Sequence, residues 1–323
     1  MNNKLVYVPV SFGEGYSMSA QITCNNKKGV EIYLKNAFVL LKSVQKFNPD
    51  VDVALVTNFS LPDEFDHLFN TNNIIVYQAK FTEYLMPSTF KWSLAFFKIA
   101  AVKWVYQNTD YEYVLQLESD QICISNFDDM WSELDHSFLT MFSPFRLNHV
   151  SRQKYTEIFK LIHSNYRGDV ICKTGAGFIA GNKKHINMFV NMADEVYANM
   201  MKNIDVISTE TGDELYTSLF CSLYPECVKP ANPYIDVYWT GGFYFASTNY
   251  HYDAVSILHL PSEKQTGFIA LYKYYLRKGY LPSNEYIFKL LRFPKTKPPF
   301  TWLSFWLRIG RVWGKCMSVI RRV

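Results

Sequence analysis

The stretch YVLQLESDQICISNF, residues 113–127, decides the fold predicted for this chain. It opens with an apolar run, Tyr113 to Leu117, that has the length and composition of a buried strand. Two carboxylates, Glu118 and Asp120, follow at once. In an open α/β sheet the carboxyl ends of the strands border the crevice in which ligands bind. The stretch therefore predicts two acidic side chains at the edge of a ligand crevice.

A divalent cation would explain why two acids follow this strand. Neighbouring carboxylates raise one another's pKa, so a pair seldom stays ionised without a cation nearby. Carboxylate oxygens are ligands that suit Mg²⁺ or Mn²⁺. A strand that ends in a solvated acidic turn is the alternative, and these residues alone do not decide between the two.

The segments around this stretch indicate an α/β domain. Short apolar runs predict strands at residues 5–10, 51–56, 74–77, 113–117, 138–142 and 256–260. Helical patterning predicts helices at residues 32–47, 92–107, 151–163, 184–202 and 213–223. The segments 11–29 and 58–73 are expected to be loops, because they are polar or contain Gly and Pro. The alternation of strands and helices in the first half predicts a mostly parallel sheet.

Composition predicts a folded protein in a reducing compartment. Of the 323 residues, 49% are hydrophobic and 19% are charged, which allows a sizeable core. The six cysteines form no C-x-x-C pair and no Cys/His cluster with zinc spacing, so free thiols in the cytoplasm are expected. The first residues, MNNKLVYVPV, lack the apolar core of a signal peptide, and no run of 18 apolar residues predicts a membrane span.

Charge is distributed unevenly along the chain. Residues 289–323 carry nine Lys or Arg and no acid, whereas residues 1–288 hold 24 basic residues against 29 acids, a net charge of −5. The segment Lys295–Pro299 is rich in Pro and Lys and is the one credible boundary. We therefore expect a domain of residues 1–290 and a basic tail of residues 291–323, with an anionic surface as the partner of the tail.

A helix of residues 300–323 would be amphipathic. Its apolar face would carry Trp302, Phe305, Trp306, Ile309, Trp313, Met317 and Ile320. Its basic face would carry Arg308, Arg311, Lys315 and Arg322. This pattern is typical of a helix that lies in a membrane interface, and it favours peripheral attachment to the inner face of the cell membrane. A helix packed on the protein's own core is the alternative. No nucleic-acid motif accompanies the basic residues, so nucleic-acid binding is not expected.

Three further features are candidates for chemistry. Asp213 and Glu214 open a predicted helix, where acids also serve as simple partners of the helix dipole. His259 lies in the strand of residues 256–260, whose period of two could direct it into the crevice, and Lys264 follows five residues later. Glycines punctuate the run Gly175–Gly181, and glycine permits a backbone to approach a ligand closely.

The order of these features resembles the GT-A glycosyltransferases, and most closely the retaining galactosyl- and glucosyltransferases that build bacterial lipopolysaccharide. The resemblance covers residues 4–270. Its matching motifs are Lys98 in a helix, Glu118-Ser119-Asp120 in place of a D-x-D motif, the strand start Thr174–Gly177, the helix start Asp213-Glu214, and the late pair His259 and Lys264. Two departures are that Glu118 replaces the first Asp, and that Lys264 lies one residue closer to the His than in the family and lacks the family's following Pro-Trp.

The resemblance implies a GT-A fold, which is a Rossmann-like, mostly parallel mixed sheet flanked by helices. It implies a metal-dependent transfer of sugar from a nucleotide sugar, a UDP-sugar above all, to a membrane-linked glycan of lipopolysaccharide, O-antigen or capsule. Mn²⁺ or Mg²⁺ would be held by Asp120 and His259. Glu118 would be a third metal ligand or would contact the ribose of the donor.

The resemblance also implies roles for the remaining residues. The donor site would include Val8, Lys98, Glu118, Ser119, Gly175, Ala176 and Lys264. The carboxylates of Asp213 and Glu214 would stabilise positive charge at the anomeric carbon, or one of them would be the general base of an inverting enzyme. Two alternatives stay open. They are a metal-dependent phosphoesterase or nucleotide-sugar hydrolase, which would need more ligands for a two-metal site, and a non-catalytic membrane scaffold.

Overall fold

The computed structural model describes residues 2–13, 26–143, 149–168, 172–209, 211–238, 240, 255–291, 306 and 309. The first part of the chain forms β1 (Lys4–Val10), α1 (Asn26–Phe47), β2 (Asp52–Thr57), α2 (Asp63–Thr71), β3 (Ile75–Gln78), the 3₁₀ helix η1 (Ser93–Phe96), α3 (Phe97–Asn108) and β4 (Tyr113–Leu117). The middle forms β5 (Gln121–Cys123), α4 (Asp128–Glu133), β6 (Phe138–Phe142), α5 (His149–Ile162), β7 (Thr174–Asn182) and α6 (Lys183–Lys202). The last part forms α7 (Glu214–Leu223), η2 (Pro225–Cys227), β8 (Val228–Pro230), β9 (Ile235–Val237), β10 (Ile257–His259), η4 (Pro261–Glu263), α8 (Gly267–Lys278) and α9 (Asn284–Leu290).

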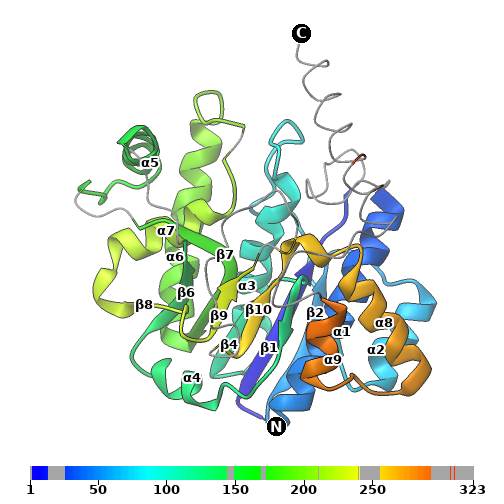
Figure 1. Ribbon diagram of the computed structural model, residues 1–323. Helices are drawn as coiled ribbons and strands as arrows, with labels where there is room; N and C mark the ends of the chain where they lie inside the picture. The colour runs from blue at the N-terminus through cyan, green and yellow to red at the C-terminus, as the bar shows by residue number, and fades with distance from the viewer. Residues whose placement is uncertain are drawn as a thin grey trace.

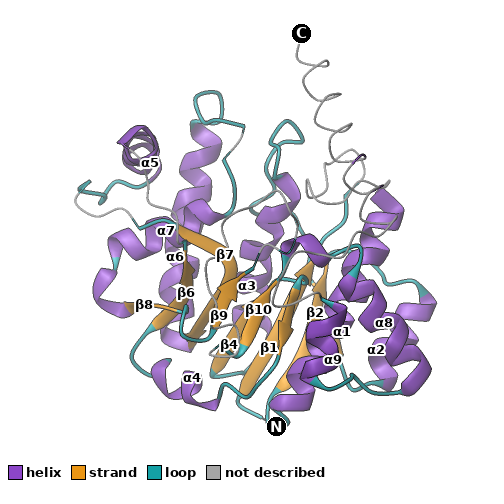
Figure 2. Ribbon diagram, viewed as in Figure 1, coloured by secondary structure: helices purple, strands orange, loops and turns teal. Residues whose placement is uncertain are grey.

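A sheet of strands forms the centre of the molecule (Figure 2). It has seven strands in the order β3-β2-β1-β4-β7-β6-β8. Strands β3, β2, β1 and β4 pair in parallel, and β6 pairs in parallel with β8. Only β7 runs against its neighbours, β4 and β6. The predicted mixed, mostly parallel sheet is therefore confirmed.

Helices cover both faces of this sheet because its central strands are apolar on both sides (Figure 1). In β1, Val6 and Val8 belong to one buried core together with Phe38 of α1. The alternate residues Leu5 and Tyr7 belong to a second core, which α3 and α6 cover. Successive side chains of a strand point to opposite faces, so one continuous apolar run supplies both cores.

Strand β7 is longer than its neighbour β4 and runs past it. Only its last five residues, Phe178 to Asn182, pair with β4, so residues 174–177 extend beyond Leu117. There Gly175 and Thr174 pair with Met141 and Phe142 of β6, and a register shift between Thr140 and Met141 separates these pairs from those further along β7. This extension, called here the β7 overhang, lies beside the acidic turn that follows β4.

A second sheet of three strands, in the order β5-β10-β9, begins directly after the acidic turn. Strand β10 is antiparallel to β5, and His259 pairs with Gln121. The backbone N–H of Leu260 donates to the carbonyl oxygen of Asp120 at 2.8 Å. This pairing brings the end of β10 to the end of β4, although 139 residues separate Asp120 from His259 in the sequence.

The end of α1 fastens the chain that leaves the acidic turn. The hydroxyl of Ser43 accepts a hydrogen bond from the backbone N–H of Cys123 at 2.9 Å. The side-chain oxygen of Asn48 accepts from the backbone N–H of Phe127 at 3.0 Å. Both polar side chains are buried, so these hydrogen bonds hold β5 in place from behind.

Several elements differ from those expected from the sequence. The predicted loop 58–73 contains α2, which buries only Phe65 and Phe69 and so gives a weak apolar repeat. Helix α1 begins at Asn26, within the segment expected to be a loop, and the helix predicted at residues 92–107 begins as the 3₁₀ helix η1. The short strands β8 and β9 and the helices α8 and α9 were not among the predicted elements.

The predicted tail, residues 291–323, lies outside the described residues except at Leu291, Trp306 and Ile309, and Leu291 is buried in the core. Trp306 and Ile309 are helical, and they are 63% and 41% exposed. Within the described part of the chain, no helix combines the length and the hydropathy needed to cross a bilayer. The boundary between residues 290 and 291 and the amphipathic helix of residues 300–323 stay predictions.

Candidate functional site

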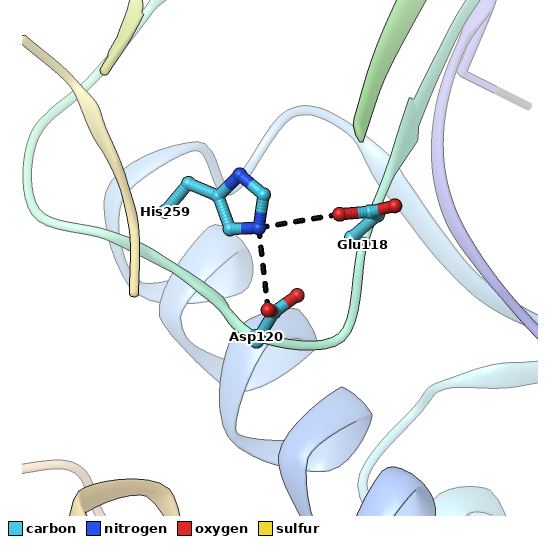
Figure 3. A group of neighbouring side chains, drawn as sticks. All are labelled: Glu118, Asp120 and His259. Carbon is cyan, nitrogen blue, oxygen red and sulfur yellow. Dashed lines mark ion pairs between the residues drawn. The ribbon is translucent and has the colours of Figure 1, made fainter. Parts of the chain in front are cut away.

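Two carboxylates and one imidazole converge where β4 and β10 end (Figure 3). The Nε2 atom of His259 lies 3.2 Å from Oε2 of Glu118 and 3.2 Å from Oδ2 of Asp120. One ligand atom from each residue lies within 4.8 Å of the other two. Among the residues that the structure describes, this is the one group of three His, Cys, Asp or Glu side chains with such spacing.

This group fits a divalent metal ion. Two carboxylate oxygens and one imidazole nitrogen point toward a common centre, and all three are donors that Mn²⁺ and Mg²⁺ sites employ. Asp120 and His259 are buried, whereas Glu118 is partly exposed, which leaves one side open to an incoming ligand. The strands fix the positions of these side chains, because β5 follows the acidic turn directly and pairs with β10, which carries His259.

Two lysines extend the group into a row of alternating charges. Lys264 Nζ lies 2.5 Å from Oδ2 of Asp120. Lys98 Nζ lies 2.5 Å from Oε1 of Glu118 and 2.5 Å from Oδ2 of Asp213. The row, called here the charge chain, runs Asp213, Lys98, Glu118, His259, Asp120 and Lys264. It joins the candidate metal ligands to the predicted acidic helix start.

The charge chain shifts the pKa values of its members in different directions. Burial raises the pKa of the Asp120 carboxyl, but Lys264 and His259 together bring it down to about 2. Burial lowers the pKa of the His259 imidazole, yet Asp120 and Glu118 raise it to about 9. Burial dominates at Asp213 and raises its pKa to about 6, despite the neighbouring Lys98. Asp213 is therefore a much weaker acid than Asp120.

The two predicted catalytic acids are placed differently. Asp213 is 5% exposed and directs its carboxylate to Lys98, so it belongs to the charge chain. Glu214 is the first residue of α7, and its carboxylate folds back over Gly212: a Cβ added there would lie 2.2 Å from Oε2 of Glu214. The geometry connects Asp213 to the metal ligands more directly than it connects Glu214.

Buried hydroxyl groups fix the position of α7, and with it Asp213. The hydroxyl of Thr174, at the start of β7, donates to that of Thr217 at 2.6 Å. The backbone N–H of Thr174 donates to the hydroxyl of Ser218 at 3.1 Å. All three side chains are buried, so the first turns of α7 are tied to the β7 overhang.

Gly177 is a site residue that nothing in its glycine-rich run distinguishes from the neighbouring glycines. A Cβ at this position would lie 2.9 Å from Oε2 of Glu118 and 3.2 Å from Nε2 of Gln121. The Gln121 side chain also donates to the carbonyl oxygen of Gly177 at 2.6 Å. The glycine thus leaves room for the Glu118 carboxylate, which packs directly on the backbone of β7.

The other predicted donor-site residues differ in their exposure and in what they contact. Val8 is fully buried in the core of β1, so only its backbone is available to a ligand. Ser119 is buried within the acidic turn. Gly175 packs on the end of the Met141 side chain, since a Cβ there would lie 2.6 Å from its Cε. Ala176 follows it in the β7 overhang.

Solved structures with a similar chain path are glycosyltransferases. The galactosyltransferase LgtC, solved with donor and acceptor sugar analogues, aligns over 91% of this chain and 98% of its own, with a TM-score of 0.50 and 15% identity. The chain has the GT-A glycosyltransferase fold. An active-site variant of LgtC aligns over 80% of this chain and 86% of its own, with a TM-score of 0.48 and 16% identity. Mouse xyloside xylosyltransferase 1 in its apo form aligns over 79% and 96%, with a TM-score of 0.47 and 12% identity.

The resemblance seen in the sequence is therefore confirmed at the level of the fold. No protein-family model and no curated protein sequence matches the chain. In this GT-A fold the charge chain lies where the parallel strand β4 ends, which is the side of an open α/β sheet where ligands bind.

Replacement of Gly177 by Ala is expected to weaken Mn²⁺ binding. The added methyl group would push Glu118 away from His259 and Asp120, and displaced supporting groups typically cost metal sites about 10- to 100-fold in affinity. Titration calorimetry with Mn²⁺ measures this loss. The control is Gly181→Ala in the same strand, where the methyl group would meet only His185 and Ile186 at 3.3 Å. Equal Mn²⁺ affinity in both variants would show that Gly177 has no such role.

Proposed function

We propose that this protein is a metal-dependent glycosyltransferase that moves a sugar from a nucleotide-sugar donor to a glycan acceptor. The observation that carries the proposal is the convergence of Glu118, Asp120 and His259 at the end of β4 in a GT-A fold. A UDP-sugar is the proposed donor, because the sequence resembles the galactosyl- and glucosyltransferases of lipopolysaccharide. LgtC, a galactosyltransferase with a similar fold, was solved with donor and acceptor sugar analogues.

The residues of the charge chain have different roles in the proposed reaction. Asp120 and His259 would hold Mn²⁺ or Mg²⁺, with Glu118 as the third ligand. A bound cation of this kind takes up negative charge on a diphosphate leaving group as the glycosidic bond breaks. Lys98 keeps Glu118 and Asp213 in fixed positions, since one ammonium group contacts both carboxylates.

Asp213 is the proposed residue on the sugar side of the site. A glycosyl transition state develops positive charge at the anomeric carbon, and a nearby carboxylate stabilises it. Asp213 is buried, and the ammonium of Lys98 contacts both its carboxylate and that of Glu118. One lysine therefore separates Asp213 from the candidate metal ligands. Glu214 is the second proposed acid and lies beside it at the start of α7.

The rival hydrolase function expects a second metal centre. A two-metal site places two cations about 3.5–4 Å apart and needs more carboxylates or imidazoles than a single site. In the described ranges only Glu118, Asp120 and His259 are spaced as metal ligands. This favours a single cation that serves a diphosphate leaving group.

The proposed acceptor is a lipid-linked glycan, and the basic tail is the proposed means of reaching it. Trp306 and Ile309 are helical, three residues apart and exposed, as expected for one apolar face of a helix. The tail's eight basic residues would attract anionic lipids of a membrane surface. Such attachment on the cytoplasmic face would keep the crevice close to an acceptor whose lipid remains in the bilayer.

Activity should require a divalent cation and Asp120. Release of UDP from a panel of UDP-sugars is expected to stop in EDTA and to return with Mn²⁺. Asp120→Asn and His259→Ala should each lower the rate by more than about 100-fold, because loss of a direct ligand exceeds the 10- to 100-fold effect of supporting residues. Asp129→Asn, an exposed acid of α4, is the matched control. Full activity of Asp120→Asn, or of the wild type in EDTA, would contradict the proposal.

Asp213→Asn should reduce kcat far more than it changes KM for the donor. Loss of an electrostatic contact that forms only in the transition state typically lowers kcat by about 10²- to 10³-fold. Glu214→Gln should have a smaller effect, because its carboxylate lies over Gly212. Steady-state kinetics with donor as the varied substrate separates the two parameters. A rise in KM alone would assign Asp213 to donor binding instead.

Removal of the tail should abolish membrane binding. Full-length protein is expected to sediment with anionic vesicles, and a chain that ends at Pro294 should stay in the supernatant yet act on a soluble acceptor analogue. Changing Arg308, Arg311, Lys315 and Arg322 to Gln should weaken binding by about 4 kcal/mol at most, at about 1 kcal/mol for each charge. A higher salt concentration should also weaken the binding of the wild-type protein to the vesicles. Equal sedimentation of the full-length and shortened chains would refute this role.

A further inference from the structure

Lys264 contacts one of the three candidate metal-ligand atoms directly. Its ammonium lies 2.5 Å from Oδ2 of Asp120, and the same oxygen lies 3.2 Å from Nε2 of His259. The side chains of Lys264 and Asp120 are only 10% and 2% exposed. Oδ2 of Asp120 therefore contacts the Lys264 ammonium and is also the oxygen of Asp120 that would bind the metal ion.

The backbone that carries Lys264 is fixed from the opposite side by Glu263. The Glu263 carboxylate is buried and accepts hydrogen bonds from three donors: the hydroxyl of Thr240, the hydroxyl of Thr266 at 2.7 Å, and the backbone N–H of Gly267 at 3.3 Å. These bonds hold the turn between β10 and α8. The Lys264 ammonium can therefore move by rotation of its flexible four-carbon side chain, while the backbone stays in place.

A divalent cation and the Lys264 ammonium are rivals for this oxygen. A buried carboxylate such as Asp120 needs a positive neighbour, and Lys264 supplies one. Two positive groups on the same oxygen would repel one another strongly, because the interior screens charge poorly. A cation bound by Asp120 would therefore drive Lys264 toward another anion.

We propose that Lys264 competes with the divalent cation for Asp120 and moves to the donor's diphosphate when cation and nucleotide are both bound. The inference rests on the proposed function, which brings a diphosphate to this crevice. Phosphate oxygens accept strong charge-assisted hydrogen bonds from ammonium groups, so the buried lysine exchanges one anion for another. Cation and nucleotide then favour one another's binding, each by the same factor.

The test measures binding of Mn²⁺ to the full-length protein by titration calorimetry, with and without UDP. Lys264→Gln and Lys264→Met remove the competing charge, and Gln still donates a hydrogen bond to Asp120. Both should bind Mn²⁺ alone about tenfold more tightly than the wild type, within the 5- to 150-fold range of coupled sites. The gain in Mn²⁺ affinity that UDP confers on the wild type should shrink in both variants by a similar factor.

Two further variants control for charge and for general effects of substitution. Lys264→Arg keeps a competing cation and should resemble the wild type, as should Lys273→Gln, an exposed position of α8. If Lys264→Gln and Lys264→Met bind Mn²⁺ no better than the wild type, or if UDP has no effect on the wild type, the competition is refuted. Those results would leave a metal-dependent transferase standing. Failure of every form to bind Mn²⁺, with or without UDP, would overturn the inference and the proposed function together.

Discussion

The clustering of three carboxylates at the end of β4, two of them buried and one partly exposed, is the constraint on which the site depends. An uncompensated charge in a protein interior costs several kcal/mol, so Asp213, Glu118 and Asp120 each need positive neighbours. Lys98, His259 and Lys264 supply them, and these cations come from three different parts of the fold. Helix α3, strand β10 and the turn before α8 are therefore fixed relative to one another by electrostatics as well as by apolar packing.

The second sheet provides the geometry that this charge pattern requires. A residue that follows β4 would ordinarily meet only neighbours from adjacent parallel strands. Because β5 turns back and pairs with β10, His259 arrives from the opposite direction and faces the acids that precede β5. The hydrogen bonds of Ser43 and Asn48 to the backbone after the acidic turn support this arrangement from α1. The site is thus held between two sheets and one long helix.

The metal-ligand role of His259 was inferred from the resemblance to the GT-A glycosyltransferases, whereas local patterns in the sequence were sufficient to predict the mostly parallel sheet, the acids after β4 and a strand that contains His259. Each of these depends on residues that are close together in the chain, such as the apolar run before Glu118. The role of Gly177 could not be predicted, because it follows from the register that pairs Leu117 with Phe178. The pairing of Lys264 with Asp120 joins residues 144 positions apart, and no local pattern contains that information. Helix α2 was missed because only two of its residues are buried.

The β7 overhang has a mechanical consequence. Residues 174–177 extend beyond β4, and only Thr174 and Gly175 of them pair with β6. The register shifts between Met141 and Thr140, so Gly177, the residue beneath Glu118, lies at an irregularity of the strand and not in a regular ladder. Irregularities of this kind bend a strand, and they are common next to active sites. The Gln121 side chain, which donates to the carbonyl oxygen of Gly177 at 2.6 Å, therefore replaces the missing strand partner and braces the backbone on which Glu118 rests.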